Sequence, residues 1–118
     1  MNIIILFLLF ATKHFIVDWV IQTNKMATEK GNNFYYLFLH SFEHAILSFL
    51  ILINFTNVET ALLLSASEIF THGGIDYLKA NKKLLGRYKY PSKLYFVILG
   101  ADQFVHQINY LLFIYLIT

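Results

Sequence analysis

Four apolar stretches, separated by short polar connections, account for most of the chain. They cover about residues 2–21, 34–55, 58–79 and 94–117, and each approaches the roughly 20 residues that a helix needs to cross a bilayer. Connections this short place consecutive helices antiparallel to one another. The pattern predicts an all-α membrane protein, an antiparallel bundle of four transmembrane helices in which residues 1–118 form a single polytopic domain.

The composition agrees with a membrane environment. Hydrophobic residues make up 58% of the chain and charged residues 14%, whereas a soluble domain carries about 25% charged residues. No Lys or Arg precedes the first apolar stretch, and His14 and Asp18 continue its helical pattern, so we interpret it as an uncleaved membrane helix and not as a signal peptide. The absence of cysteine excludes disulfides, thiolate metal sites and a cysteine nucleophile.

The basic residues gather around the connections at 22–33 and 80–93, which an up-down topology puts on one side of the membrane. These residues are Lys25, Lys30, Lys79, Lys82, Lys83, Arg87, Lys89 and Lys93. The opposite side has Glu59 and essentially no Lys or Arg. The positive-inside rule then predicts that both connections are cytoplasmic and that both termini lie outside. A basic run between apolar segments is typical of a juxtamembrane loop, so no nucleic-acid partner is expected.

Each predicted helix carries ionisable residues at a spacing of four, which places them on one face. The pairs are His14 and Asp18, His40 and His44, His72 and Asp76, and Asp102 and His106. At a rise of about 1.5 Å per residue, all four pairs lie roughly 10 Å from the cytoplasmic ends of their helices. We therefore expect the four polar faces to meet at one level inside the bilayer.

Such a cluster needs compensation, because a charged residue at the centre of a membrane helix costs about 2.5–3.5 kcal/mol. The residues can pair, line a wet cavity or bind an ion. Imidazole and carboxylate are the usual ligands of zinc, manganese or iron, so all eight residues are candidate ligands for one or two divalent ions, zinc first. Any single pair could equally be an interhelical hydrogen bond.

Within this set, Asp18, Asp76 and Asp102 are the candidate catalytic carboxylates. Polar residues nearby could orient ligands or bind substrate, and Lys79 is a candidate for holding an anionic head group. These outer candidates are Gln22, Glu43, Glu68, Lys79 and Gln103. Lys13 points about 100° away from His14 around the helix, so we expect it to snorkel or to form a separate pair. Two glycines, at 73 and 74, predict close helix packing beside the third polar face.

These motifs resemble those of a family of small bacterial and phage integral membrane proteins of unknown function. The matching segments are His14-Phe-Ile-Val-Asp18-Trp-Val-Ile-Gln22 with Lys25, then His40, His72-Gly-Gly-Ile-Asp76-Tyr-Leu-Lys79 and Asp102-Gln103-Phe-Val-His106. The resemblance covers nearly the whole chain and implies a membrane fold, a bacterial inner-membrane location and a metal site. The His/Asp pattern is also distantly similar to that of membrane-bound metal-dependent hydrolases.

Three functions fit these expectations. The first is a metal-dependent hydrolase that acts on an amphipathic or lipid-like substrate from the cytoplasmic side. The second is an ion, proton or metal transporter, which the apolar outer halves of the helices disfavour because a transport path must reach both sides. The third is a non-catalytic accessory protein whose polar cluster fixes helix register. Beyond the lipid bilayer, so short a chain allows homo-oligomerisation or a membrane partner protein.

Overall fold

The computed structural model describes residues 2–118, and within that range it contains helices and no strands. The helices are α1 (Ile3–Phe15), a π-helical segment η1 (Ile16–Ile21), α2 (Asn24–Glu29), α3 (Phe34–Leu52), α4 (Val58–Ala80), a 3₁₀ turn η2 (Leu85–Arg87) and α5 (Lys93–Ile117). The all-helical prediction is therefore confirmed.

Each long helix begins after a polar residue whose side chain accepts a hydrogen bond from a backbone N–H of the first turn. Asn2 caps α1, Asn33 caps α3, Asn57 caps α4 and Ser92 caps α5. These side chains satisfy donors that would otherwise lack an intrahelical partner, and each such cap contributes about 1 kcal/mol. The caps explain why the helices start where the apolar pattern begins.

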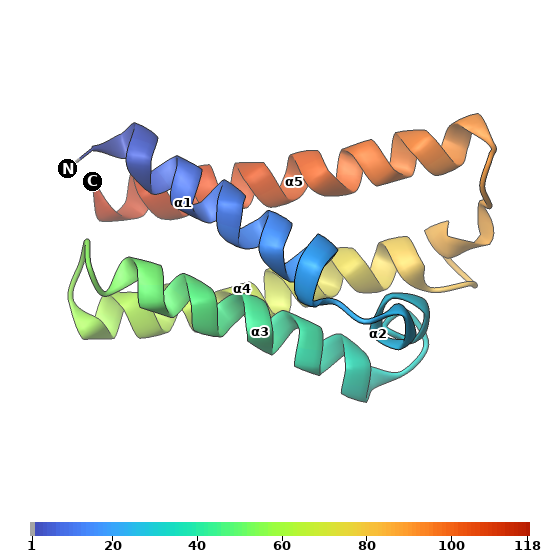
Figure 1. Cartoon of the computed structure of the whole chain (residues 1–118), viewed down its shortest axis with the longest axis horizontal. Coiled ribbons are helices and arrows are strands. Elements are labelled where there is room, and N and C mark those ends of the chain that lie inside the picture. Colours follow the sequence, from blue (N-terminus) through green and yellow to red (C-terminus); the bar gives the residue numbers. More distant parts are fainter. Residues whose placement is uncertain (1) are drawn as a thin grey trace.

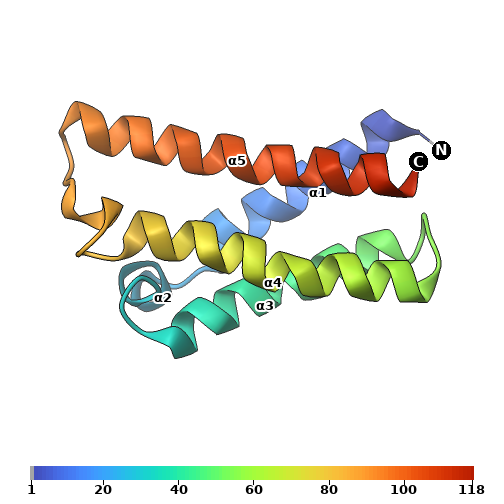
Figure 2. The same ribbon diagram turned by 180° about the vertical axis from the view of Figure 1, so that it is seen from behind.

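The four long segments lie against one another (Figure 1). Helices α3 and α4 are joined by a short turn and pack along much of their length, and α5 runs beside α4, as the reverse view in Figure 2 also shows. Helix α1 crosses obliquely and contacts both α3 and α5. Both chain ends lie at one end of the molecule, and α2 and the α4–α5 connection lie at the other.

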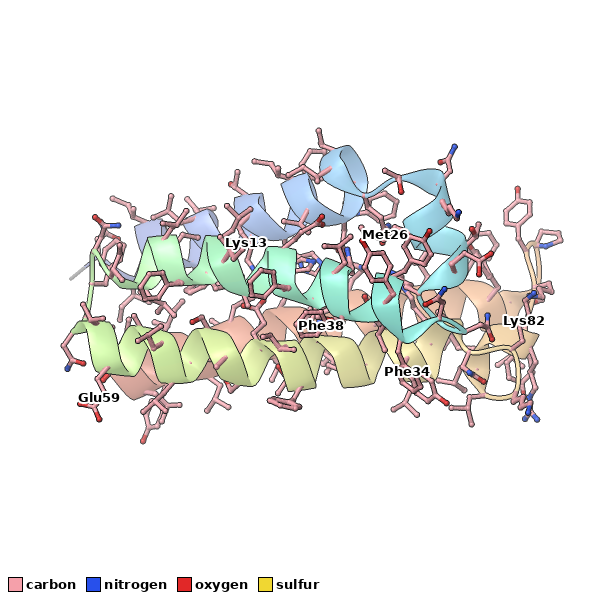
Figure 3. All side chains as sticks on the ribbon, turned by 90° about the horizontal axis from the view of Figure 1, so that it is seen from below. Lys13, Met26, Phe34, Phe38, Glu59 and Lys82 are labelled. Carbon is pink, nitrogen blue, oxygen red and sulfur yellow. The ribbon has the colours of Figure 1, made fainter. Side chains whose placement is uncertain are left out.

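Among the described residues, three helical segments are long and apolar enough to cross a membrane: Ile3–Ile21, α3 and α5. Helix α4 has 23 residues but carries Glu59, Glu68, Asp76 and Lys79, and it does not reach the same apolarity. Large apolar side chains project outward all around the molecule, and Phe70 on α4 itself is 80% exposed. Figure 3 shows these side chains and places Glu59 and Lys82 at opposite ends.

An apolar core fills the half of the molecule nearest the chain ends. It consists of Leu6, Phe10, Leu52, Ala61, Tyr110, Phe113 and Ile114. The rings of Phe10 and Tyr110 stack with centroids 5.1 Å apart, and the Tyr110 hydroxyl faces the polar groups described below. The core therefore borders the polar cluster on one side.

Several predicted boundaries differ from the structure. The first span is not one α-helix, because it changes to π geometry after Phe15. The predicted polar loop at 23–33 contains α2, which Thr23 caps through a hydrogen bond from the Met26 N–H. Helix α3 ends at Leu52 and not near residue 55. Just after this end, the Asn54 side chain donates a hydrogen bond to the Leu50 carbonyl in the last turn of the helix.

The two glycines of α4 play different parts. A Cβ on Gly73 would lie 2.9 Å from Ser41 Oγ, so this glycine permits the close approach of α3 and α4. A Cβ on Gly74 would meet nothing within 4 Å. The packing prediction is therefore confirmed for Gly73 and wrong for Gly74, where an added Cβ would occupy open space.

Candidate metal centre

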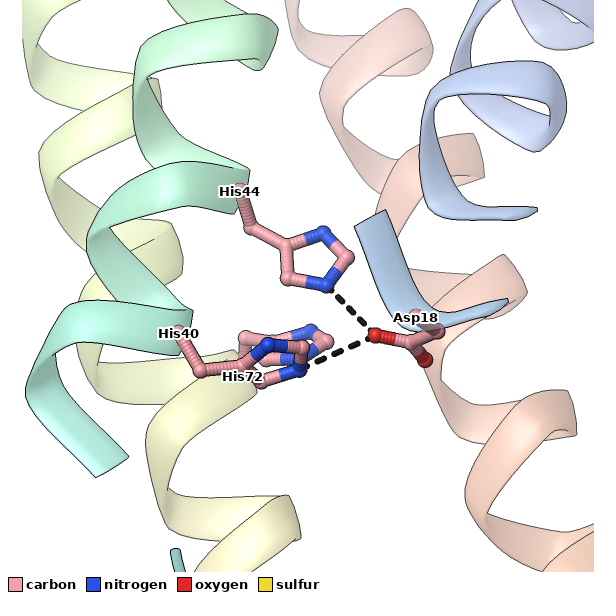
Figure 4. Close-up of side chains that lie close together, drawn as sticks. All are labelled: Asp18, His40, His44 and His72. Carbon is pink, nitrogen blue, oxygen red and sulfur yellow. Dashed lines mark hydrogen bonds and ion pairs between the residues drawn. The ribbon is translucent and has the colours of Figure 1, made fainter. Parts of the chain in front are cut away.

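Asp18 is the first hub of the cluster, and three histidines from two helices converge on it. Its Oδ1 lies 2.8 Å from His44 Nε2 and 3.0 Å from His40 Nε2, and its Oδ2 lies 3.0 Å from His14 Nε2. Figure 4 shows His40 and His44 reaching from α3 toward Asp18. All three imidazoles are buried.

The π-helical geometry of η1 positions Asp18. The N–H of Gln22 donates to the carbonyl of Val17, five residues earlier, at 3.1 Å. Such segments are rare and short in helices and often occur at functional sites. Here the π turn lies at the residue that carries the central carboxylate.

Asp76 is the second hub. Its Oδ2 lies 3.1 Å from His72 Nε2, 3.3 Å from His40 Nε2 and 3.2 Å from Lys30 Nζ, and its Oδ1 lies 3.4 Å from His106 Nε2. The Asp76 side chain is almost fully enclosed. His40 lies within ion-pair distance of both hubs, so the two hubs form one continuous cluster.

Two overlapping groups have the spacing of a metal site. The larger comprises Asp18, His40, His44 and His72, and the smaller comprises His72, Asp76 and His106. In each group, one potential ligand atom per residue lies within 4.8 Å of all the others. Six of the eight ligands predicted from the sequence therefore belong to one group or the other.

Two histidine nitrogens in these groups indicate whether the site suits a metal ion. His40 Nε2 and His72 Nε2 are buried, and neither makes a hydrogen bond, although both lie within 3.3 Å of a carboxylate oxygen. The contacts of these two nitrogens with the carboxylates are therefore short in distance but lack hydrogen-bond geometry. A buried polar atom without a partner costs about 1–3 kcal/mol, and a cation between the carboxylates would remove that cost. The residues present therefore fit a divalent ion.

The remaining two predicted ligands, His14 and Asp102, lie beside the groups. His14 Nε2 is 2.8 Å from Gln103 Oε1 and its Nδ1 is 3.0 Å from the Tyr110 hydroxyl, so both ring nitrogens already have partners. Asp102 Oδ2 accepts hydrogen bonds from Lys79 Nζ at 2.8 Å and from Gln103 Nε2 at 2.9 Å. These contacts place Lys79 and Gln103 against the cluster.

Lys13 and Tyr110 extend the cluster toward the apolar core. The sequence predicted that Lys13 would snorkel or pair, and it did not point to Tyr110. Lys13 Nζ lies 2.6 Å from Glu68 Oε1 and 2.9 Å from the Tyr110 hydroxyl, and it also contacts His44 Nδ1 at 3.1 Å. Because Lys13 is 4% exposed, it forms a buried pair and the snorkelling alternative is wrong. Figure 3 places it between the helices.

Lys30 is the other missed contributor. Its position in a predicted cytoplasmic loop suggested an exposed charge, but it is 4% exposed and reaches Asp76 and the Gln22 side-chain oxygen. The short helix α2 carries it back over the cluster. Glu43, in contrast, is half-buried and makes no hydrogen bond or ion pair with the cluster in the described part of the chain.

The charges of the buried set do not balance. Four carboxylates, Asp18, Glu68, Asp76 and Asp102, face three lysines, Lys13, Lys30 and Lys79. With neutral histidines the enclosed region has an excess of negative charge, which burial makes unfavourable. One protonated histidine would balance this excess, whereas a divalent ion would replace it with an excess of one positive charge.

Comparison with curated proteins of known function gave no match, and comparison with solved structures gave none either. A sequence model of one protein family matches residues 4–118, nearly the whole chain. The chain belongs to that family, whose description is "Protein of unknown function (DUF3307)".

Proposed function

We propose that this chain is a bacterial inner-membrane protein that binds a divalent metal and hydrolyses an amphipathic or lipid-like substrate from the cytoplasmic side. In this proposal all four long helices cross the bilayer as an antiparallel bundle, with the basic connections in the cytoplasm and both termini outside. The observation that carries the proposal is the convergence of His40 Nε2 and His72 Nε2 on Asp18 and Asp76 without hydrogen bonds.

The neighbours of α4 support the proposal that it spans the membrane. Its ionisable residues Glu68 and Asp76 are buried against α1, α2 and α5, whereas Phe70 and other apolar side chains face outward. Polar groups inside a membrane bundle face its interior and pair with one another. Helix α4 can thus span a bilayer despite its modest apolarity.

Zinc fits the nitrogen-rich larger group best, and manganese or iron are the alternatives. Because His72 belongs to both groups, two ions would have to share or compete for it. If one ion occupies the larger group, Asp76 and His106 are not ligands and remain available for proton transfer. When bound, zinc supplies a Lewis acid that polarises the scissile group and activates water.

The chain's own residues could then move protons. His106 Nε2 forms a hydrogen bond of 3.4 Å with Asp76 Oδ1, so it can exchange a proton with that carboxylate. Asp102 Oδ1 lies 3.0 Å from the same nitrogen but without hydrogen-bond geometry. A carboxylate at hydrogen-bond distance from the reacting groups can act as a general base. Lys79 would hold Asp102 in place, because its ammonium group donates to the other oxygen of that carboxylate.

The apolar core favours hydrolysis over transport. A transport path would have to pass through Leu6, Phe10, Leu52 and Phe113, whose side chains are at most 2% exposed. Metal or proton flux into proteoliposomes is expected to be absent, and measurable flux would favour the transporter.

The first test is metal content. The protein is purified in detergent from cells supplied with zinc, manganese and iron, and the ions are counted by mass spectrometry. We expect at least one ion per chain in the wild type and loss of most of it in His72→Gln. Thr71→Val changes the adjacent exposed position and should retain the metal, so it is the matched control.

Metal-free wild-type protein would refute the proposal. Equal metal in the wild type and His72→Gln would place the ion elsewhere and would also refute it. If the ion is present, hydrolysis of ester- and phosphate-bearing amphiphiles in mixed micelles is measured before and after chelation. If removal of the metal by chelation changes the hydrolysis of none of these substrates, the non-catalytic accessory role is favoured.

A further inference from the structure

A cavity of about 550 Å³ opens at the end of the fold that carries the basic connections. Its walls come from α2, the last turn of α4, the connection that follows it and the first turns of α5. Four lysines line it, Lys30, Lys79, Lys82 and Lys89, and Glu29 is the one acidic lining residue within the described chain. The lining therefore carries more positive than negative side chains.

Two of these lysines connect the cavity to the candidate metal centre. Lys30 Nζ lies 3.2 Å from Asp76 Oδ2, and Lys79 Nζ lies 2.8 Å from Asp102 Oδ2. Both side chains line the cavity and also contact a carboxylate of the cluster. The inner end of the cavity thus adjoins the proposed reaction centre.

The other two lysines, Lys82 and Lys89, do not connect the cavity to the candidate metal centre. Lys82 and Lys89 are exposed, and neither makes an ion pair with any residue of the described range 2–118. Tyr88 also lines the cavity; its hydroxyl accepts a hydrogen bond from Arg87 and keeps its own proton to donate. Unpaired ammonium groups and a hydroxyl donor suit a multiply charged anion, and lysine commonly binds phosphate as a point charge.

Part of the remaining wall is apolar. Leu85, Ile98 and Leu99 line the cavity beside the lysines, and α5 continues from there as a candidate membrane span. A ligand with a charged head and an apolar portion would match both parts of the lining. A fully polar anion would leave the apolar wall without a partner.

We propose that this cavity binds the phosphate group of an anionic amphiphile, and that Lys82 and Lys89 hold the phosphate next to the metal centre. This inference rests on the proposed function, since it names the substrate class of the same site. Lys30 and Lys79 then lie between the bound phosphate and the carboxylates. A phosphate-bearing lipid head group and free phosphate share this chemistry, and the test separates them.

The test measures binding by calorimetry in detergent at one salt concentration. The ligands are dihexanoyl phosphatidic acid, dihexanoyl phosphatidylcholine and inorganic phosphate. The proteins are the wild type, Lys82→Gln/Lys89→Gln, and the matched control Lys83→Gln/Lys93→Gln, which removes two basic residues of the same region that do not line the cavity. Metal content is measured on every sample.

We expect phosphatidic acid to bind at least tenfold more tightly than phosphatidylcholine, and the cavity variant to lose about tenfold in affinity because it lacks two charge contacts. The control should lose less than twofold. Phosphate that binds as tightly as phosphatidic acid would support the phosphate site with a free-phosphate ligand. No preference for phosphatidic acid, or equal losses in both variants, would overturn the inference.

Metal content keeps the two proposals apart. Normal metal in all three proteins together with no phosphate preference would defeat the cavity proposal and leave the metal proposal standing. Metal-free protein that still binds phosphatidic acid through Lys82 and Lys89 would defeat the metal proposal and leave the cavity proposal standing.

Discussion

Lys13 and Glu68 form an ion pair at the boundary between the polar cluster and the apolar core, and its removal should be costly. The Nζ–Oε1 distance is 2.6 Å, and the side chains are 3% and 1% exposed. At an effective dielectric constant of about 20, charges this close attract by about 6 kcal/mol. The loss of hydration on burial offsets much of that attraction, so the cost of breaking the pair is the more useful quantity.

Lys13→Met leaves the Glu68 carboxylate buried with only the Tyr110 hydroxyl as a donor. We expect it to lower the free energy of unfolding by about 3–5 kcal/mol, the usual cost of an unpaired buried charge. Glu68→Gln should cost less, because Lys13 keeps its contacts with Tyr110 and His44. The double variant Lys13→Met/Glu68→Gln should recover most of the loss.

Unfolding by a denaturing detergent in mixed micelles, followed by circular dichroism, measures these differences. Lys83→Met, at an exposed position, is the control and should change stability by less than about 0.5 kcal/mol. A double-mutant coupling energy of about 2 kcal/mol or more is expected. Strictly additive effects, with coupling below about 0.5 kcal/mol, would show that the two residues do not share one buried pair.

Three further predictions use the same unfolding assay. Gly73→Ala should destabilise the protein by about 1–3 kcal/mol, because the new methyl group meets Ser41 of α3. Gly74→Ala should stabilise it by about 0.5–1 kcal/mol, because alanine has the higher helix propensity. Equal effects of the two substitutions would contradict the described packing of α3 and α4. Lys30→Met should cost about 3 kcal/mol or more, as the loss of a buried partner does, and Lys25→Met, at an exposed position, almost nothing; similar costs would mean that Lys30 is not enclosed. Chelation should destabilise the wild type by about 3 kcal/mol if the ion was present at about 100 times its dissociation constant and leave His72→Gln unchanged; an equal shift in both proteins would exclude His72 as a ligand.

The sequence was sufficient to predict the helices and the meeting of all five histidines, because a spacing of four fixes one face of a helix and a constant rise fixes depth. Prediction from the sequence fails where a long side chain or an irregular turn departs from that regular helix geometry. Lys13 lies about 100° from His14 around the helix, yet its flexible side chain reaches Glu68. A signal was present: a lysine within an apolar span needs a partner.

Lys30 and Asp18 show the second limit. Lys30 was assigned to a loop because the segment is polar, and only the capped helix α2 returns it to the cluster. Thr23 before that helix was a possible cue. The π turn around Asp18 has no comparable cue, since its residues fit a regular α-helix equally well.

The π turn between Phe15 and Gln22 also constrains how the length of this protein can vary. The turn accommodates one more residue than an α-helical turn would, so Asp18 keeps its place only while the number of residues in that segment is preserved. A single deletion there would convert the turn to α geometry and rotate one flank of the helix relative to the other, without altering a single cluster side chain. Relatives that have a regular α-helix at this point should accordingly be one residue shorter there.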